Sequence, residues 1–213
     1  MVTSRKPFND LIPRAITIFF LGTIVTVTYF FMPHMLSLLL AACLCIMVWH
    51  EWARLGDWWL TPLYPVAPFI FLILLNESPE RPLLLFVFLY SGLFDCAGYF
   101  VGSLYGQHKL APYLSPRKTW EGLIAGFVTL WLSLPLLTKL FSLHALGWWR
   151  LPFVITYGTL AISGDLIVSF FKRRAGVKDS SNLLPGHGGL LDRFASYLLT
   201  GVFIYALKNY LIA

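Results

Sequence analysis

The chain has 213 residues, of which 58% are hydrophobic and only 12% charged, and its formal net charge is +6. Soluble globular domains carry about 25% charged residues. This composition therefore excludes an ordinary soluble protein and predicts an all-α, polytopic helical membrane protein with one domain over residues 1–213. A positive charge in such a protein is typical of basic residues gathered on the cytoplasmic face and of phosphate or anionic-lipid partners. We expect no nucleic-acid partner.

Several apolar runs approach the roughly 20 residues that an α-helix needs to cross a bilayer. We predict about seven transmembrane helices, over Ala15–Met32, Met35–Ala53, Leu60–Leu75, Pro82–Gly102, Trp120–Phe141, Leu151–Phe171 and Gly189–Ile212. The third run contains Pro62, Pro65 and Pro68, so a kinked, short or re-entrant segment is the alternative there. The basic N-terminus is followed by no small-residue cleavage site, and we expect Ala15–Met32 to be a span and not a removed signal peptide.

The positions of the basic residues orient these spans. With a cytoplasmic N-terminus, twelve of the 16 basic residues lie on the inside. The remaining basic residues, on the outside, are Arg81, Lys139, Arg150 and Lys208. Because Lys and Arg are enriched in cytoplasmic segments, the sequence predicts that loop 103–119 and the segment Ser169–Ala195 both face the cytoplasm. A re-entrant third segment would require the first two spans to be redrawn.

Five carboxylates lie inside predicted spans or at their ends: Glu51, Asp95, Glu121, Asp165 and Asp192. Acidic residues in membrane segments are costly and are functional candidates by default. The three aspartates converge on one basic face, which indicates a site for Mg²⁺, since this ion prefers a few carboxylates together with substrate phosphates. The alternative for the aspartates is a buried hydrogen bond or ion pair, and for the two glutamates it is a solvated helix end.

The loop Gly102–Gly122 places hydroxyl groups and cations directly before a predicted helix. Its candidate anion-binding residues are Ser115, Arg117, Lys118 and Thr119. Thr119 or Ser115 could cap the helix that starts at Trp120, and a helix N-terminus with basic residues is a ready anion site. An ordinary positive-inside loop with an N-cap is the alternative.

The segment Ser169–Ala195 combines basic residues, glycines and carboxylates between two apolar runs. Glycines on both sides of His187 would let backbone amides approach an anion, as in other phosphate-binding loops. Asp192 falls in the first turn of the next predicted helix, with Arg193 beside it. The alternative for the basic run after the preceding span is topology anchoring or contact with anionic headgroups. The segment as a whole predicts a site for a phosphate-bearing substrate and a metal.

This segment resembles the signature of the phosphatidate cytidylyltransferase (CDP-diacylglycerol synthase) family. The matching residues are Ser169, Lys172, Arg173, Lys178, Asp179, Ser181, Leu184, Pro185, His187, Gly188, Gly189, Asp192 and Arg193. SPRKTWEG at Ser115–Gly122 is similar to that family's Ser-Pro-x-Lys-Thr-Trp-Glu-Gly segment, and further matches lie at Asp95, Tyr99, Gly102, Gly106, His108, Lys109 and Ser163–Asp165. The resemblance covers residues 51–213, a cytidylyltransferase-like region, and leaves 1–50 as N-terminal spans.

The resemblance implies a Mg²⁺-dependent enzyme of phospholipid biosynthesis, with a second, monovalent cation as an option. It would transfer CMP from CTP to a membrane lipid phosphate, first of all phosphatidic acid, giving CDP-diacylglycerol and pyrophosphate. The implied place is the bacterial inner (cytoplasmic) membrane, with the site facing the cytoplasm, membrane lipids as partners and a homodimer as one option. The alternatives are a CTP-dependent enzyme acting on a polyprenyl or isoprenoid phosphate, and a non-catalytic homologue that binds lipid or nucleotide.

The resemblance also assigns roles to residues of this sequence. The implied catalytic residues are Asp165, Asp192, Lys178 and His187. The implied metal ligands are Asp165, Asp192 and Asp179. The implied substrate-binding residues are Ser115, Lys118, Thr119, Glu121, Lys172, Arg173, Gly188, Gly189, Arg193 and Asp95. A transfer of this kind depends on positioning and charge neutralisation more than on a covalent nucleophile.

The sequence departs from the signature at Ala195, where the family's Asp-Arg-x-Asp ends in an aspartate. Positions 192 and 195 are i and i+3 on one helix face, so two carboxylates there could hold metal ions together. Three explanations of the missing aspartate are open: an engineered change, natural divergence, or compensation by another carboxylate such as Asp179. We expect the fold and substrate binding to be retained and catalysis to be impaired. The chain is also short for this family, and we expect the missing length to be N-terminal.

Overall fold

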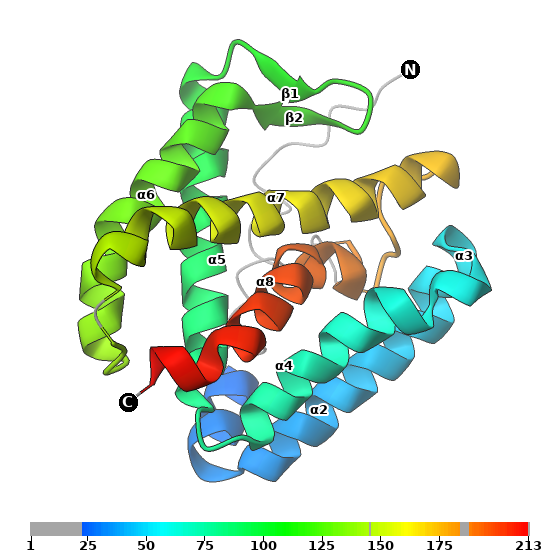
Figure 1. Cartoon of the computed structure of the whole chain (residues 1–213). Helices are drawn as coiled ribbons and strands as arrows, with labels where there is room; N and C mark the ends of the chain where they lie inside the picture. Colours follow the sequence, from blue (N-terminus) through cyan, green and yellow to red (C-terminus); the bar gives the residue numbers. More distant parts are fainter. Residues whose placement is uncertain (1–22, 145, 184–187, 213) are drawn as a thin grey trace.

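The computed structural model describes residues 23–144, 146–183 and 188–212. Over these ranges the chain forms a bundle of long helices with one small two-stranded sheet (Figure 1). Residues 23–31 are helical. The first part of the predicted span Ala15–Met32, residues 15–22, lies outside the described residues, as does His187.

Six helical segments of the described chain are long and apolar enough to cross a membrane. They are Pro33–Leu55, Trp58–Glu77, Pro82–Tyr105, Trp120–Leu140, Gly147–Arg174 and Leu190–Leu211. Each overlaps one of the last six predicted spans, with bounds that differ by a few residues. The prediction of an all-α polytopic membrane protein is therefore confirmed.

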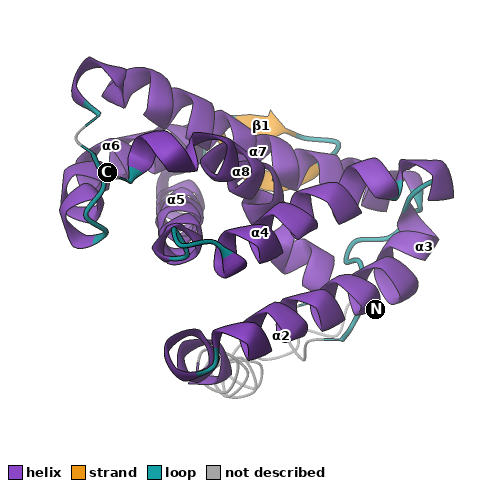
Figure 2. Ribbon diagram, turned by 60° about the horizontal axis from the view of Figure 1, so that its bottom comes forward, coloured by secondary structure: helices purple, strands orange, loops and turns teal. Residues whose placement is uncertain are grey.

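The first two of these segments form an antiparallel pair that is broken by irregular turns. α2 (Pro33–Ile46) continues through a π-helical turn, Met47–Trp52, into the short α3 (Ala53–Leu55). The chain then returns through a 3-10 turn, Trp58–Leu60, and a second π-helical turn, Pro62–Val66, into α4 (Ala67–Glu77). α2 and α4 lie side by side in both views (Figures 1 and 2).

The prolines of the third predicted span disturb the helix locally. Tyr64 adopts an extended backbone, with φ −150° and ψ 125°, inside the turn Pro62–Val66, and regular helix resumes at Ala67. The predicted kink is thus confirmed. Together the pieces still form a helical segment of 20 residues, Trp58–Glu77, which has the length needed to cross a membrane.

α5 (Pro82–Tyr105) and α6 (Trp120–Leu140) pack against each other with their backbones unusually close. A Cβ atom on Gly122 would lie 2.5 Å from the carbonyl oxygen of Gly98, so glycine is required where these helices meet. Between them, β1 (Lys109–Ala111) pairs with β2 (Ser115–Thr119) in an antiparallel hairpin. The sequence predicted only a loop here, because the strand Ser115–Thr119 is polar and contains a proline.

α7 (Arg150–Arg174) and α8 (Leu190–Leu211) form the other closely packed pair. A Cβ atom on Gly164 would overlap the carbonyl oxygen of Ala195, so the glycine allows the two helices to touch. α8 also packs on α4, where Gly201 faces Leu72. In Figure 1, α7 crosses in front of α5 and α6.

Contacts between distant segments define two ends of this bundle. Glu51 meets the first residues of α8, and Arg174 pairs with Asp57, so the end of α7, the start of α8 and the turn after α3 lie together. The hairpin joins them through Arg173. We call this the loop end. At the opposite end, Lys208 pairs with Glu80. The two basic segments that the sequence placed on one side of the membrane therefore meet in space.

Candidate functional site

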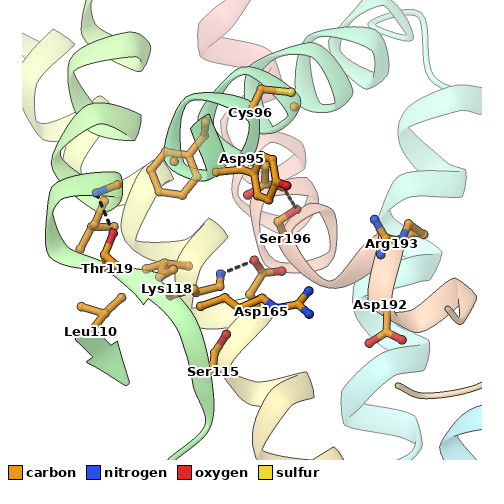
Figure 3. A pocket seen from close by; sticks show the side chains of 18 of the residues that line it. Asp95, Cys96, Leu110, Ser115, Lys118, Thr119, Asp165, Asp192, Arg193 and Ser196 are labelled. Atoms are coloured by element: carbon orange, nitrogen blue, oxygen red, sulfur yellow. Dashed lines mark hydrogen bonds and ion pairs between the residues drawn. The ribbon is translucent and has the colours of Figure 1, made fainter. Parts of the chain in front are cut away.

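A cavity of about 470 Å³ lies at the loop end, between α5, the hairpin, α6, α7 and α8 (Figure 3). Its charged lining combines three carboxylates with three basic side chains: Asp95, Asp165, Asp192, Arg117, Lys118 and Arg193. Its apolar lining includes Phe94, Leu123 and Ile162. The volume falls within the range of about 300–1,000 Å³ that is typical of small-molecule sites.

Lys118 and Asp165 form an ion pair across this cavity. Lys118 is near the end of β2, which leads directly into α6. Asp165 lies on α7, one residue after Gly164, where α7 contacts α8. Both side chains keep about a quarter of their surface exposed, 25% and 22%. The pair is therefore formed in a half-buried place that a ligand can still reach, and Figure 3 shows the two groups facing each other.

Asp95 is linked to the other side of the cavity. Its carboxylate accepts a hydrogen bond of 2.9 Å from the Ser196 hydroxyl, which joins α5 to α8. The sequence predicted that Asp95 would order the pocket. In the described chain its place on the cavity wall and this one hydrogen bond are consistent with that role.

Both carboxylate oxygens of Asp192 have partners within the protein. Its Oδ1 lies 2.5 Å from Lys172 Nζ, and only 7% of its side chain is exposed. Its Oδ2 accepts hydrogen bonds from the Ser180 amide at 2.9 Å and the Gly189 amide at 3.2 Å, and it shares the Ser180 hydroxyl, 3.0 Å away, with Glu51. Because Asp192 stands in the first turn of α8, its negative charge also suits the positive end of the helix.

Glu51 is the functional candidate that sequence reasoning undervalued. A solvated helix end was one of its two interpretations, and this is wrong, because Glu51 is 0% exposed. Its carboxylate accepts four hydrogen bonds, from Ser180, Ser181, Leu190 and Leu191. Only its position at the end of an apolar run pointed to it, since its partners lie 129 to 140 positions away.

The three basic residues at the end of α7 each bind a different part of the protein. Lys172 binds Asp192, whereas Arg173 donates to the carbonyl oxygens of Leu114 at 3.1 Å and Val177 at 2.8 Å. Arg174 forms two hydrogen bonds with Asp57. Lys172 and Arg173, both expected to bind substrate, are not among the cavity-lining residues of the described chain. In this structure they fix α8 and the hairpin in place.

The remaining residues of the predicted site fall into two groups. Ser115 and Thr119 line the cavity, and the Thr119 side chain caps α6 by accepting a hydrogen bond of 3.2 Å from Gly122 N, so the predicted N-cap is confirmed. Glu121 instead holds the hairpin, accepting from His108 N at 3.1 Å and lying 2.6 Å from His108 Nδ1. Lys178 is exposed, and neither it nor Glu121 belongs to the described cavity lining.

The two glycines before α8 are needed for different reasons. Gly188 has a φ of +82°, a conformation that other residues rarely adopt, and a Cβ there would lie 3.1 Å from Asp192 Oδ2 and 3.6 Å from Asp179 Cβ. A Cβ on Gly189 would lie 2.6 Å from Glu51 Oε1. The amides of residues 189–191 thus bind the protein's own carboxylates, where the sequence predicted that glycines would expose amides to a substrate anion.

The side chains at the cavity show how the predicted Mg²⁺ could be bound. Within the described ranges, no cluster of three or more His, Cys, Asp and Glu side chains could hold a metal ion by itself. Figure 3 shows Asp192 apart from the Lys118–Asp165 pair. Mg²⁺ is commonly bound by one or two carboxylates together with substrate phosphates. The three cations and three carboxylates of the lining also cancel, so a triphosphate would bring unbalanced negative charge. The residues therefore fit a metal that arrives with a nucleotide.

Comparison with known proteins identifies the family. Residues 1–211 match the model of the cytidylyltransferase family. A phosphatidate cytidylyltransferase of Staphylococcus epidermidis is 44% identical over 130 residues, covering 61% of this chain and 48% of the relative. One from Haemophilus influenzae is 49% identical over 119 residues, covering 54% and 41%. One from Rickettsia conorii is 35% identical over 153 residues, covering 69% and 66%.

The chain spans about half the length of the first of these curated relatives. The family match nevertheless extends over nearly all of its residues, including the hairpin, both close helix pairs and the cavity. The chain belongs to the cytidylyltransferase family.

Proposed function

We propose that this protein transfers CMP from CTP to a membrane lipid phosphate, phosphatidic acid first of all, to give CDP-diacylglycerol and pyrophosphate. The observation that carries the proposal is the Lys118–Asp165 pair, which stands where a cavity with a charged wall meets membrane-spanning helices. The similarity to proteins named phosphatidate cytidylyltransferase supports the same choice of substrates.

The two kinds of lining suit the two substrates. The cations Arg117, Lys118 and Arg193 would bind phosphate oxygens, because charge-assisted hydrogen bonds to phosphate are strong. The apolar residues Leu123 and Ile162 lie on spans α6 and α7 and would contact the glycerol and acyl part of the lipid. A lipid in the bilayer and a nucleotide from the aqueous side could thus meet in one cavity.

The reaction is a displacement at phosphorus. An oxygen of the lipid phosphate forms a bond to the α-phosphorus of CTP, the bond from that phosphorus to the bridging oxygen breaks, and pyrophosphate leaves with the oxygen. Lys118 would stabilise the charge that develops on these oxygens and would be released from Asp165 as it does so. Arg193 would hold the phosphates from the side of α8.

Mg²⁺ is part of this proposal, with Asp165 and Asp192 as the carboxylates that would hold it beside the phosphates. When bound, it would neutralise the charge of the triphosphate. Asp179 is exposed, and its Cβ lies 3.6 Å from the position that a Cβ on Gly188 would take. It would act as a third carboxylate beside the loop before α8, outside the cavity.

We propose that the protein lies in the bacterial inner membrane with the loop end towards the cytoplasm, where CTP is found. The basic residues of that end support this orientation.

The test is a transfer assay with the detergent-purified chain, CTP, Mg²⁺ and one lipid phosphate at a time. We expect CDP-diacylglycerol from phosphatidic acid and much less product from a polyprenyl phosphate. Lys118→Ala should slow the reaction by about 100-fold or more. Lys139→Ala, a matched change at the opposite end of α6, should leave it unchanged. A preference for the polyprenyl phosphate, or full activity of Lys118→Ala, would contradict the proposal.

A further inference from the structure

Glu51 is buried without a cationic partner in the described part of the chain. It lies in the π-helical turn Met47–Trp52 and is 0% exposed. No ion pair involves it over the described ranges, and it does not line the cavity there. Burying an unpaired carboxylate is costly unless hydrogen bonds satisfy it. Single-turn π-helical bulges inside α-helices often occur at functional sites.

Four hydrogen bonds from two separate segments satisfy this carboxylate. The Ser180 and Ser181 hydroxyls donate at 2.9 Å and 2.7 Å. The backbone N–H groups of Leu190 and Leu191, the first two residues of α8, donate at 2.8 Å and 2.7 Å. A carboxylate offers about four acceptor positions, and the N-terminus of a helix favours negative charge. Glu51 therefore binds the start of α8 as an internal anion.

Ser180 connects Glu51 to Asp192. Its hydroxyl oxygen lies 2.9 Å from Glu51 Oε2 and 3.0 Å from Asp192 Oδ2, while its amide donates to Asp192 at 2.9 Å. A serine hydroxyl has one proton, so it can donate to only one of the two carboxylates at a time. Gly189 fills the remaining space between them, where any side chain would clash with Ser180 Oγ and Glu51.

We propose that Glu51 is a positioning residue for Asp192. By holding Ser180, Ser181 and the first turn of α8, it fixes the place at which the Asp192 carboxylate meets Lys172 and the cavity. Glu51 itself touches no substrate. The proposal rests on the proposed function, because the role of Asp192 in holding Mg²⁺ and phosphates belongs to that function. Outer-shell partners of metal ligands typically change metal affinity or activity by about 10- to 100-fold when they are lost.

Glu51→Gln is the sharpest variant, because it keeps the shape and replaces one acceptor oxygen by an NH₂ group that faces N–H donors. We expect the Mg²⁺ concentration for half-maximal activity to rise about 10-fold or more, and kcat at low Mg²⁺ to fall about 10- to 100-fold. The KM for phosphatidic acid should not change. A merely structural role would lower the amount of folded protein without moving the Mg²⁺ requirement.

Glu77→Gln is the matched control. Glu77 also accepts side-chain hydrogen bonds, from Ser37 and His34, but at the opposite end of the bundle. We expect wild-type Mg²⁺ dependence for this variant. If Glu51→Gln does not fold, Ser180→Ala replaces it: this change removes only the hydroxyl shared by the two carboxylates and should shift the Mg²⁺ requirement in the same direction by a smaller factor.

Hydrogen exchange at the Leu190 and Leu191 amides gives a second readout that is independent of turnover. Exchange should be faster in Glu51→Gln than in the wild type and unchanged in Glu77→Gln. A wild type that makes no CDP-lipid would refute the proposed function, and the exchange rates would still show whether Glu51 fixes α8. Wild-type exchange in Glu51→Gln, or an unchanged Mg²⁺ requirement in an active enzyme, would overturn the inference.

Discussion

Lys118 on β2 donates a hydrogen bond to the carboxylate of Asp165 on α7, although the two residues lie 47 positions apart in the chain. The contact joins the hairpin to the close α7–α8 pair, and both residues lie on the wall of the cavity. A lysine in such a pair can move to a phosphate when one arrives. The carboxylate that it leaves then becomes free to contact a cation.

Replacing Lys118 should therefore affect nucleotide handling more than folding. We expect Lys118→Ala to reduce kcat/KM for CTP by about 100-fold or more, because removing a single preorganised donor at a reacting phosphate or carbonyl costs about that much. Steady-state kinetics with varied CTP measure the effect. Near-normal kcat/KM for CTP would show that Lys118 does not contact the reacting phosphates.

Asp192 should matter both for activity and for the start of α8. Asp192→Asn removes the charge that binds Lys172 and weakens the acceptor for three N–H and O–H donors. We expect turnover to fall about 100-fold. The loss of a cap alone costs only about 1 kcal/mol. The control is Asp57→Asn, which breaks the exposed pair with Arg174 and should cost no more than about 1 kcal/mol of stability. Full activity of Asp192→Asn would show that this residue takes no part in the reaction.

Sequence reasoning found the parts of this protein that local patterns determine. Hydropathy placed six spans, because each depends only on the composition of about 20 consecutive residues. The cap at Thr119 and the first-turn position of Asp192 are local as well. The predicted roles of the carboxylates followed from the resemblance and from the cost of charge in a membrane.

The parts that were missed depend on distant partners. Whether Glu51 is solvated or buried is decided by the Ser180 segment and by α8, more than a hundred residues away. Arg173 could serve a substrate or the carbonyl of Leu114 equally well by sequence, and only the fold brings the hairpin turn to it. Ala195 carries no local sign that it is 2% exposed and packed against Gly164.

That position of Ala195 sharpens the prediction for the aspartate expected there by the family signature. The residue lies one turn after Asp192 and against Gly164, the neighbour of Asp165, so a carboxylate at 195 would stand close to two others. We expect Ala195→Asp to lower the melting temperature by several degrees in EDTA, since like charges in a buried place repel. Mg²⁺ should restore most of the loss and should raise turnover above that of the unmodified chain.

Melting curves of both proteins in EDTA and in Mg²⁺ test this directly. Equal stability differences in the two buffers would show that position 195 does not take part in metal binding. Unchanged turnover in the presence of Mg²⁺ would favour compensation by another carboxylate over an impaired site.

The close contact of α7 and α8 can be tested without any substrate. Gly164→Ala should destabilise the protein by about 1–3 kcal/mol, because the added Cβ overlaps the carbonyl of Ala195. Gly92→Ala on α5 is the control, as a Cβ there meets no described atom within 4 Å. It should be neutral or slightly stabilising. Thermal unfolding in one detergent compares the two variants, and equal stability would contradict the packing seen here.

The central claim is that the α-phosphorus of CTP moves to a membrane lipid phosphate. It is tested most directly by supplying phosphatidic acid and Mg²⁺ with CTP that carries its label either at the α-phosphorus or at the γ-phosphorus. We expect a labelled lipid from the α-labelled nucleotide and labelled pyrophosphate from the γ-labelled one. Label entering the lipid from the γ-position, or no labelled lipid from either nucleotide, would contradict it.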